Sequence, residues 1–170
     1  MNLRKLARED AAAFQGIRLQ GLRECPSAFS SSYEEEADTP LQTIAERLTP
    51  KPDDAIFGCF VNSKLAGVIG LQREARVKLA HKAFVWGMYV APDHRRGGIG
   101  RKLVESALRY ATTEWDIFSV TLGVNAGNEA AVALYQSMGF RTYGRETGFL
   151  RIDGMLHDEN LMVWIRASAA

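Results

Sequence analysis

The chain contains the stretch Val90-Ala91-Pro92-Asp93-His94-Arg95-Arg96-Gly97-Gly98-Ile99-Gly100. Apolar and aromatic residues precede it at 83–90, as in a buried strand, and apolar side chains recur at helical spacing from about 99 to 112. The first turn of a helix presents unpaired N–H groups and a partial positive charge. The stretch therefore predicts a loop that binds a phosphate or pyrophosphate group between a strand and a helix.

The composition of this loop fits that task. Its glycines place no side chain between the backbone and an anion, and glycine accepts the positive φ angles that turn successive N–H groups inward. Its arginines can add charge-assisted hydrogen bonds to phosphate oxygens. The glycines are Gly97, Gly98 and Gly100, and the arginines are Arg95, Arg96 and Arg101.

Two other kinds of phosphate-binding loop do not fit these residues. The ATP/GTP pattern Gly-x-x-x-x-Gly-Lys-Ser/Thr fails because Gly100 is followed by Arg101-Lys102-Leu103, which offers no hydroxyl for magnesium. The dinucleotide pattern needs its third glycine where Leu103 stands, and Pro92-Asp93-His94 separates the loop from the strand. A glycine-rich surface turn with solvated arginines is the alternative that these residues leave open.

The composition limits the class of protein. The 170 residues are 46% hydrophobic and 24% charged, which predicts one globular domain over residues 1–170. A formal net charge of +1 argues against nucleic-acid and membrane partners. Cys25 and Cys59 have no Cys or His companions, so we expect neither a disulfide nor a metal site, and Cys59 reads as a buried small hydrophobe. No signal-like or membrane-spanning apolar run is visible, which predicts a cytoplasmic protein.

The rest of the chain alternates strand-like and helix-like segments. We expect strands at 3–6, 55–61, 65–71, 83–90, 117–124, 140–146 and 155–165. We expect helices from Asp10, as N-terminal cap, to before Pro26, a short one within 28–47, and longer ones at 99–112 and 128–138. This order predicts a mixed α/β sheet, with antiparallel hairpins first and parallel crossovers later.

A second motif follows the first. It reads Asn128-Glu129-Ala130-Ala131-Val132-Ala133-Leu134-Tyr135 and is followed by Gly139-Phe140. Together with the Arg95–Gly100 loop, which matches Arg/Gln-x-x-Gly-x-Gly/Ala, and the strand before it, the sequence resembles the GNAT superfamily of N-acetyltransferases over roughly residues 55–164. The resemblance implies a GNAT-like α/β fold, in which a mixed sheet of about seven strands, flanked by about four helices, splays between strands four and five.

The resemblance also implies a reaction and roles for residues. The reaction is direct transfer of an acetyl group from acetyl-CoA, as co-substrate and without a metal, to a primary amine of a small molecule, amino acid or peptide. The loop from Arg95 to Arg101 would hold the CoA pyrophosphate. Main-chain groups of Met88, Tyr89 and Val90 would bind the pantetheine arm and the thioester and form an oxyanion hole. Asn128 would bind pantetheine, and Tyr135 would be the general acid for the leaving thiolate.

Taken alone, the residues of the second motif leave simpler roles open. Asn128 and Tyr135 are seven positions apart, so both project from one face of the predicted helix. Tyr135 could nevertheless be a packed core aromatic, and Asn128 could be only a helix cap. A non-catalytic CoA-binding regulatory module of the same fold is therefore the alternative function, and the oligomeric state, monomer or homodimer, stays open.

The sequence offers several candidates for the acceptor side and the base. A free alkyl amine has a pKa of about 10, so an acceptor near neutral pH needs a base or a proton-conducting path. Many relatives carry a glutamate six residues before the position of Val90, but here Phe84 stands there. His81, His157 within His157-Asp158-Glu159, and Tyr33 beside Glu34–Glu36 are the remaining candidates. An ending of the form Gly-x-x-x-Asp-Glu-x-x-Met, matched from Gly154 onward, occurs in relatives thought to acetylate small amines or amino acids.

Overall fold

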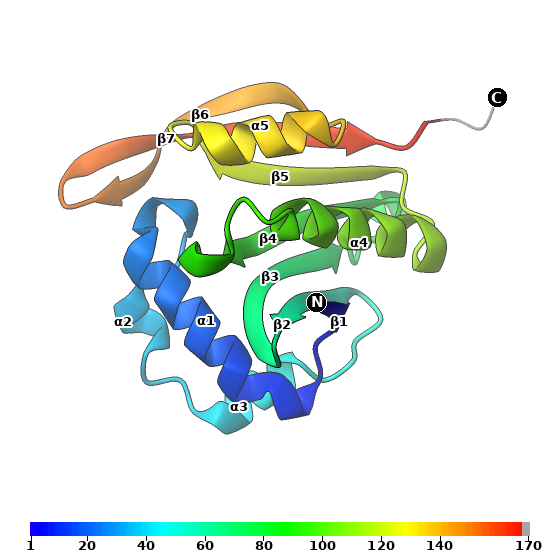
Figure 1. Cartoon of the computed structure of the whole chain (residues 1–170). Coiled ribbons are helices and arrows are strands. Elements are labelled where there is room, and N and C mark those ends of the chain that lie inside the picture. The colour runs from blue at the N-terminus through cyan, green and yellow to red at the C-terminus, as the bar shows by residue number, and fades with distance from the viewer. Residues whose placement is uncertain (168–170) are drawn as a thin grey trace.

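In a computed structural model, residues 1–167 are described, and residues 168–170 of the expected domain lie outside them. One seven-stranded sheet has the order β1-β2-β3-β4-β5-β7-β6 (Figure 1). The strands are β1 (Asn2–Lys5), β2 (Asp54–Val61), β3 (Lys64–Arg73), β4 (Lys82–Val90), β5 (Ser119–Asn125), β6 (Arg141–Ile152) and β7 (Met155–Ile165). The helices are α1 (Ala11–Glu24), α2 (Tyr33–Glu36), α3 (Leu41–Arg47), α4 (Ile99–Glu114) and α5 (Glu129–Ser137). The predicted mixed sheet is confirmed, because β4 and β5 are parallel and their neighbours pair antiparallel.

The sheet is covered by helices on both faces. Val68 and Ile69 are adjacent on β3, yet Val68 belongs to a buried cluster with residues of α1 and α3, and Ile69 to one with residues of α4. Successive side chains of a strand point to opposite faces, so the central strands read as continuous apolar runs. Cys59 is fully buried in the α4 cluster, as expected. Among the described residues, no helix is long and apolar enough to cross a membrane.

Strands β4 and β5 separate partway along their length. They pair only at three positions, the last being Phe84 with Thr121, while β5 continues to Asn125 against β7. On its other side β4 contains a bulge, since Gly87 and Met88 both face Ile69 of β3, and Gly87 has φ of +60°. A bulge bends and twists its strand. The sheet therefore splays where predicted, with β5–β7 and α5 lying apart from β1–β4 (Figure 1).

The last hairpin is longer than the sequence analysis expected. Strand β6 reaches Ile152 rather than residue 146, because Asp153 and Gly154 form a two-residue turn that pairs Ile152 with Met155. Both turn residues have positive φ, as the mirror-image hairpin turns require, and Asp-Gly is a favoured pair for them. A bulge between Glu146 and Leu150 interrupts the pairing.

Two expectations for the N-terminal half are corrected. Residues 28–47 hold two short helices, α2 and α3, instead of one. Asp10 stands at the start of α1, but its carboxylate does not cap that helix. It is held by the Arg4 guanidinium at 2.6 and 2.7 Å and accepts the Ala7 N–H at 2.9 Å, so a contact with β1 takes the place of the cap.

Candidate active site

The loop before α4 has the backbone shape that an anion site requires. Arg96 and Gly98 have φ of +62° and +79°, and Gly98 is the N-cap residue directly before the sixteen-residue helix α4. The first helical hydrogen bond joins the Lys102 N–H to the Gly98 carbonyl, so the N–H groups of Ile99, Gly100 and Arg101 have no partner in the helix. The Ile99 side chain is buried in the core, and only its main chain serves the loop.

Two of the arginines in the loop bind protein groups. Arg95 donates from Nε to the Val90 carbonyl at 2.9 Å, lies over the Tyr89 ring and pairs with Glu24 at 3.5 Å. Arg101 donates to Ser137 Oγ at 2.8 Å and contacts Met138 Sδ at the end of α5. These side chains therefore connect the loop to α1 and α5, and the unpaired main-chain N–H groups are what the loop presents.

The part of β4 beyond the splay lies between the loop and α5. A side chain on Gly100 would start 3.0 Å from Met88 Cε and 3.1 Å from Leu134 Cδ2, so the loop and both elements meet at Met88. Tyr89 is buried on the α1 side, and its hydroxyl donates to Glu24 Oε2 at 2.6 Å. That hydrogen bond is the main cause of a lowered pKa for the Glu24 carboxyl. The side chain of Tyr89 is thus committed to packing, and the edge of β4 offers its main chain.

The side chain of Tyr135, on α5, also points toward Met88. It is 6% exposed, packs edge-on against Phe140, and its hydroxyl lies 3.1 Å from Met88 Sδ. Burial raises the pKa of the phenol, so the hydroxyl stays protonated at neutral pH. At the start of the helix, Asn128 Oδ1 accepts the Ala131 N–H at 3.1 Å, which leaves the Asn128 amide nitrogen as a donor.

A cavity of about 190 Å³ opens at the splay. Its walls come from α1 at Arg18, from the turn at residues 27–30, from residues 85–87 of β4, and from β5, β6 and β7. Trp86 of β4 lines this cavity. Its buried Nε1 has no hydrogen-bond partner among the described residues. The cavity therefore combines aromatic surface with polar groups at the point where β4 leaves β5.

Glu159 belongs to the His157-Asp158-Glu159 stretch, and the sequence alone indicates no role for it. In the structure its side chain enters the cavity and its carboxylate lies on Gly123 of β5, whose missing side chain makes room for it. Burial, and then the negative charge of Glu146, raise the pKa of the Glu159 carboxyl. The neighbouring Asp158 is instead held by Arg145 at 2.8 Å and by the Gly148 N–H at 2.9 Å. Gly123, a glycine in the middle of an apolar strand, is the sequence signal that another side chain packs against β5.

Tyr33 lines an adjoining cleft of about 700 Å³, which shares Phe29, Ser30 and Leu150 with the cavity. Its hydroxyl accepts a hydrogen bond from Arg23, whose guanidinium also lies over the ring at 3.9 Å. Tyr33 therefore lies on the same side as the cavity but outside its lining.

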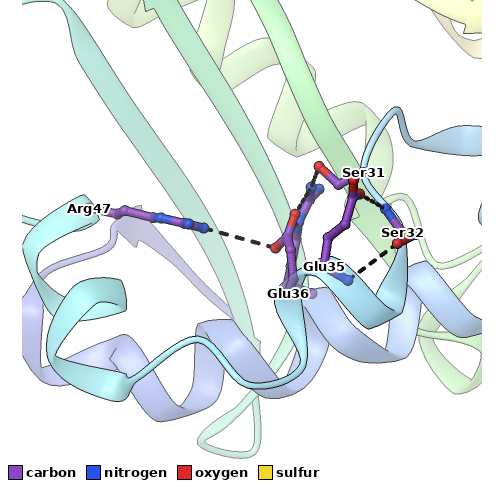
Figure 2. A network of polar contacts seen from close by, with 6 residues as sticks. Ser31, Ser32, Glu35, Glu36 and Arg47 are labelled. Atoms are coloured by element: carbon purple, nitrogen blue, oxygen red, sulfur yellow. Dashed lines mark hydrogen bonds and ion pairs between the residues drawn. The ribbon is translucent and has the colours of Figure 1, made fainter.

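The three glutamates after Tyr33 differ in their surroundings. Glu35 and Ser32 bind each other's backbone and cap α2 (Figure 2). Glu36 is instead nearly buried, and Arg18 holds its carboxylate at 2.7 and 3.1 Å. Burial tends to raise the pKa of Glu36, but Arg18, Ser31 and Arg47 together lower it. The acidic run is therefore not one solvated face, and its last member supports Arg18 on the wall of the cavity.

The two histidine candidates lie elsewhere. His157 is paired with Leu150 in the β6–β7 hairpin and does not line the cavity. His81 precedes β4, at the end away from the splay, and its ring lies 6.5 Å from that of Phe118. Phe84 occupies the last paired position of β4, so this position lies at the start of the splay and carries no carboxylate.

Comparison with known proteins places the chain in a family. The sequence model of the acetyltransferase (GNAT) family matches residues 20–140. Spermidine N(1)-acetyltransferase of Vibrio cholerae is 30% identical over 110 residues, which are 65% of this chain and 64% of that enzyme, so the chain spans less than two thirds of its relative. Among solved structures, a GNAT acetyltransferase from Streptococcus pneumoniae superimposes with a TM-score of 0.85 at 21% identity, covering 98% of this chain and 99% of that one.

A putative acetyltransferase from Salmonella typhimurium, solved with its cofactor acetyl-CoA, superimposes with a TM-score of 0.81 at 18% identity. It covers 100% of this chain and 96% of its own. These structural likenesses establish the fold, and the family match spans well over half of the sequence. The chain belongs to the GNAT family of acetyltransferases.

Proposed function

We propose that this protein transfers an acetyl group from acetyl-CoA to a primary amine. One observation carries the proposal: the Tyr135 hydroxyl lies 3.1 Å from Met88 Sδ, beside a strand edge that has left its neighbour and next to a glycine loop with unpaired N–H groups. The Tyr135 hydroxyl would thus donate to the leaving group, the free edge of β4 would bind the extended pantetheine arm, and the glycine loop would bind the pyrophosphate of the same molecule. The relative from Vibrio cholerae is named for acetylation of spermidine, which supports an amine acceptor.

The residues present fit acetyl-CoA. The N–H groups of Ile99, Gly100 and Arg101 face the anion site at the helix start, and Arg96 adds positive charge. Main-chain groups of Met88, Tyr89 and Val90 would pair with the pantetheine arm as an added strand pairs with an edge. The Asn128 amide nitrogen would donate to the same arm. Acetyl-CoA supplies an acetyl group activated as a thioester.

Two groups of the chain act on the reacting bond. An N–H of the Met88–Val90 edge would bind the carbonyl oxygen as negative charge develops on it. The Tyr135 hydroxyl would donate its proton to the departing sulfur. Its raised pKa keeps that proton in place until the thiolate forms.

The acceptor enters from the cavity lined by Arg18, Trp86 and Glu159. A small cavity with a carboxylate suits the ammonium end of a small molecule, an amino acid or a peptide. Tyr33 and the adjoining cleft would hold the rest of a longer acceptor. We propose that residues 1–170 act as one domain in the cytoplasm, which the free thiols of Cys25 and Cys59 support.

The proposal is tested by release of free thiol from acetyl-CoA in the presence of a panel of amines. We expect turnover with at least one amine, and a fall in kcat of about 100-fold or more in Tyr135→Phe, with acetyl-CoA binding retained in calorimetry. Tyr143→Phe, on the exposed face of β6, is the matched control. Acetyl-CoA binding without turnover of any amine would instead indicate a non-catalytic regulatory module.

A further inference from the structure

Resting on the acetyltransferase function, we propose that Glu159 is the base that binds the acceptor ammonium and removes its proton. Phe84 stands where β4 leaves β5 and carries no carboxylate, so the amine needs a proton acceptor from another element. The cavity at the splay contains one carboxylate among its lining residues, and it comes from β7.

The place of this carboxylate is fixed by the sheet. Gly123 lies two residues beyond Thr121, the last residue of β5 that pairs with β4. The Glu159 carboxylate occupies the position that a side chain on Gly123 would fill, with Cδ and both oxygens at 2.3–2.4 Å from that point. If the parallel register is continued past Thr121, Gly123 is level with Trp86, on the part of β4 whose edge toward β5 is free. The carboxylate therefore lies at the mouth of the gap in which the thioester would be held.

The proposed acid and base are on opposite faces of the sheet. Tyr135 belongs to the buried cluster of α4 and approaches Met88 from that side. The Glu159 cavity is instead lined by Arg18, Phe29 and Trp86, whose neighbours form the cluster of α1. An amine could thus attack from one face while the sulfur leaves toward the other, without the two proton transfers sharing space.

The charged groups around Glu159 leave its carboxylate free to bind the acceptor ammonium. No group within residues 1–167 donates a hydrogen bond to its carboxylate, and Glu146 of β6 is its partner in register. Arg18 of α1 faces the cavity but is held by Glu36 through Nε and Nη2, and His157 lies two residues away on β7. A partly desolvated carboxylate beside a second negative charge binds a proton or an ammonium readily.

The step balances with one released proton. Glu159 takes a proton from the ammonium, and the nitrogen lone pair attacks the thioester carbon to form the N–C bond. The C–S bond breaks, and its electron pair leaves on sulfur, which receives the Tyr135 proton. The nitrogen loses a second proton as the amide forms. Glu159 then releases the first proton to solvent, and the second replaces, through solvent, the proton that Tyr135 gave to sulfur, so the net reaction releases one proton.

The test compares wild type, Glu159→Gln and Glu146→Gln in thiol release from about pH 6 to pH 9. The amines are spermidine, lysine and trialanine, because alkyl amines have a pKa of about 10.4 and α-amines one of about 7.7–8.0. Glu159→Gln should lower kcat/KM about 100-fold at neutral pH, and its kcat/KM should rise about tenfold per pH unit up to the pKa of the amine. Its acetyl-CoA affinity should be unchanged.

Glu146→Gln is the matched control, because it removes a carboxylate from the opposite position of the same hairpin. It should keep its activity near neutral pH and shift the acidic limb of the profile to lower pH, since one cause of the raised pKa of Glu159 is gone. An active wild type whose pH profile is unchanged in Glu159→Gln overturns the inference and leaves the acetyltransferase function standing. A wild type that acetylates none of a wider amine panel overturns the function itself.

Discussion

Replacing Gly123 by alanine should displace the Glu159 carboxylate without removing it. The β-carbon introduced by Gly123→Ala would start 2.3–2.4 Å from the carboxyl carbon and both oxygens, whereas ordinary contacts begin at 3.4 Å. The carboxylate must therefore retreat by about 1 Å. It can do so because it is the far end of a flexible side chain, so the backbone of β5 need not move.

The displacement gives the size of the expected effect. Misplacing a reacting group by about 1 Å can cost about 100-fold in rate. We therefore expect kcat/KM for the amine to fall about 100-fold in Gly123→Ala, close to the loss in Glu159→Gln. The KM for acetyl-CoA should change little, because the loop and the edge of β4 are untouched.

Thiol release under steady-state conditions measures both parameters, and thermal unfolding shows whether the fold is intact. Gly123→Ala in the background of Glu159→Gln should cost little further, because the displaced group is already gone. A variant with normal stability and wild-type kcat/KM would refute the view that packing of the Glu159 carboxylate on Gly123 positions the base.

Three further predictions concern stability and the loop. Gly16→Ala should raise the free energy of unfolding by about 0.5–1 kcal/mol in denaturant melts, since Gly16 is an interior residue of α1 with open space around its α-carbon. Asp10→Asn should lower it by about 1–2 kcal/mol at neutral pH, because Arg4 is 40% exposed and solvent screens part of the interaction. The hydrogen bond from Arg4 lowers the pKa of Asp10 in the folded protein. The stability that Asp10 contributes is therefore complete above its unfolded pKa of about 3.9, and it is lost as the pH falls through the lowered folded pKa. Melts at acidic pH should then show a smaller difference in stability between Asp10→Asn and wild type. Gly98→Ala should weaken acetyl-CoA binding about tenfold in calorimetry, because alanine disfavours the φ of +79° by about 1–2 kcal/mol.

The sequence predicted most of the elements because their signals are local. Strands β2 to β4 and helix α4 were expected within about two residues of their ends, from apolar periodicity and from the glycines before the helix. Strand β6 was expected too short, although Asp153-Gly154 carries a hairpin signal of its own. Asp10 was expected to cap α1, and a contact with Arg4 overrode that local preference.

The sequence by itself leads to the donor side that we propose for this protein. The anion loop and the face shared by Asn128 and Tyr135 depend on neighbouring residues, whose geometry a turn or a helix sets without help from the rest of the chain. Only the tertiary structure brings together the residues of the proposed acceptor side. Glu159 meets Gly123 because β5 and β7 pair in one register, and the cavity exists because β4 bends away from β5. Such contacts join residues far apart in the chain, and a shift of one residue in register would turn Glu159 to the opposite face.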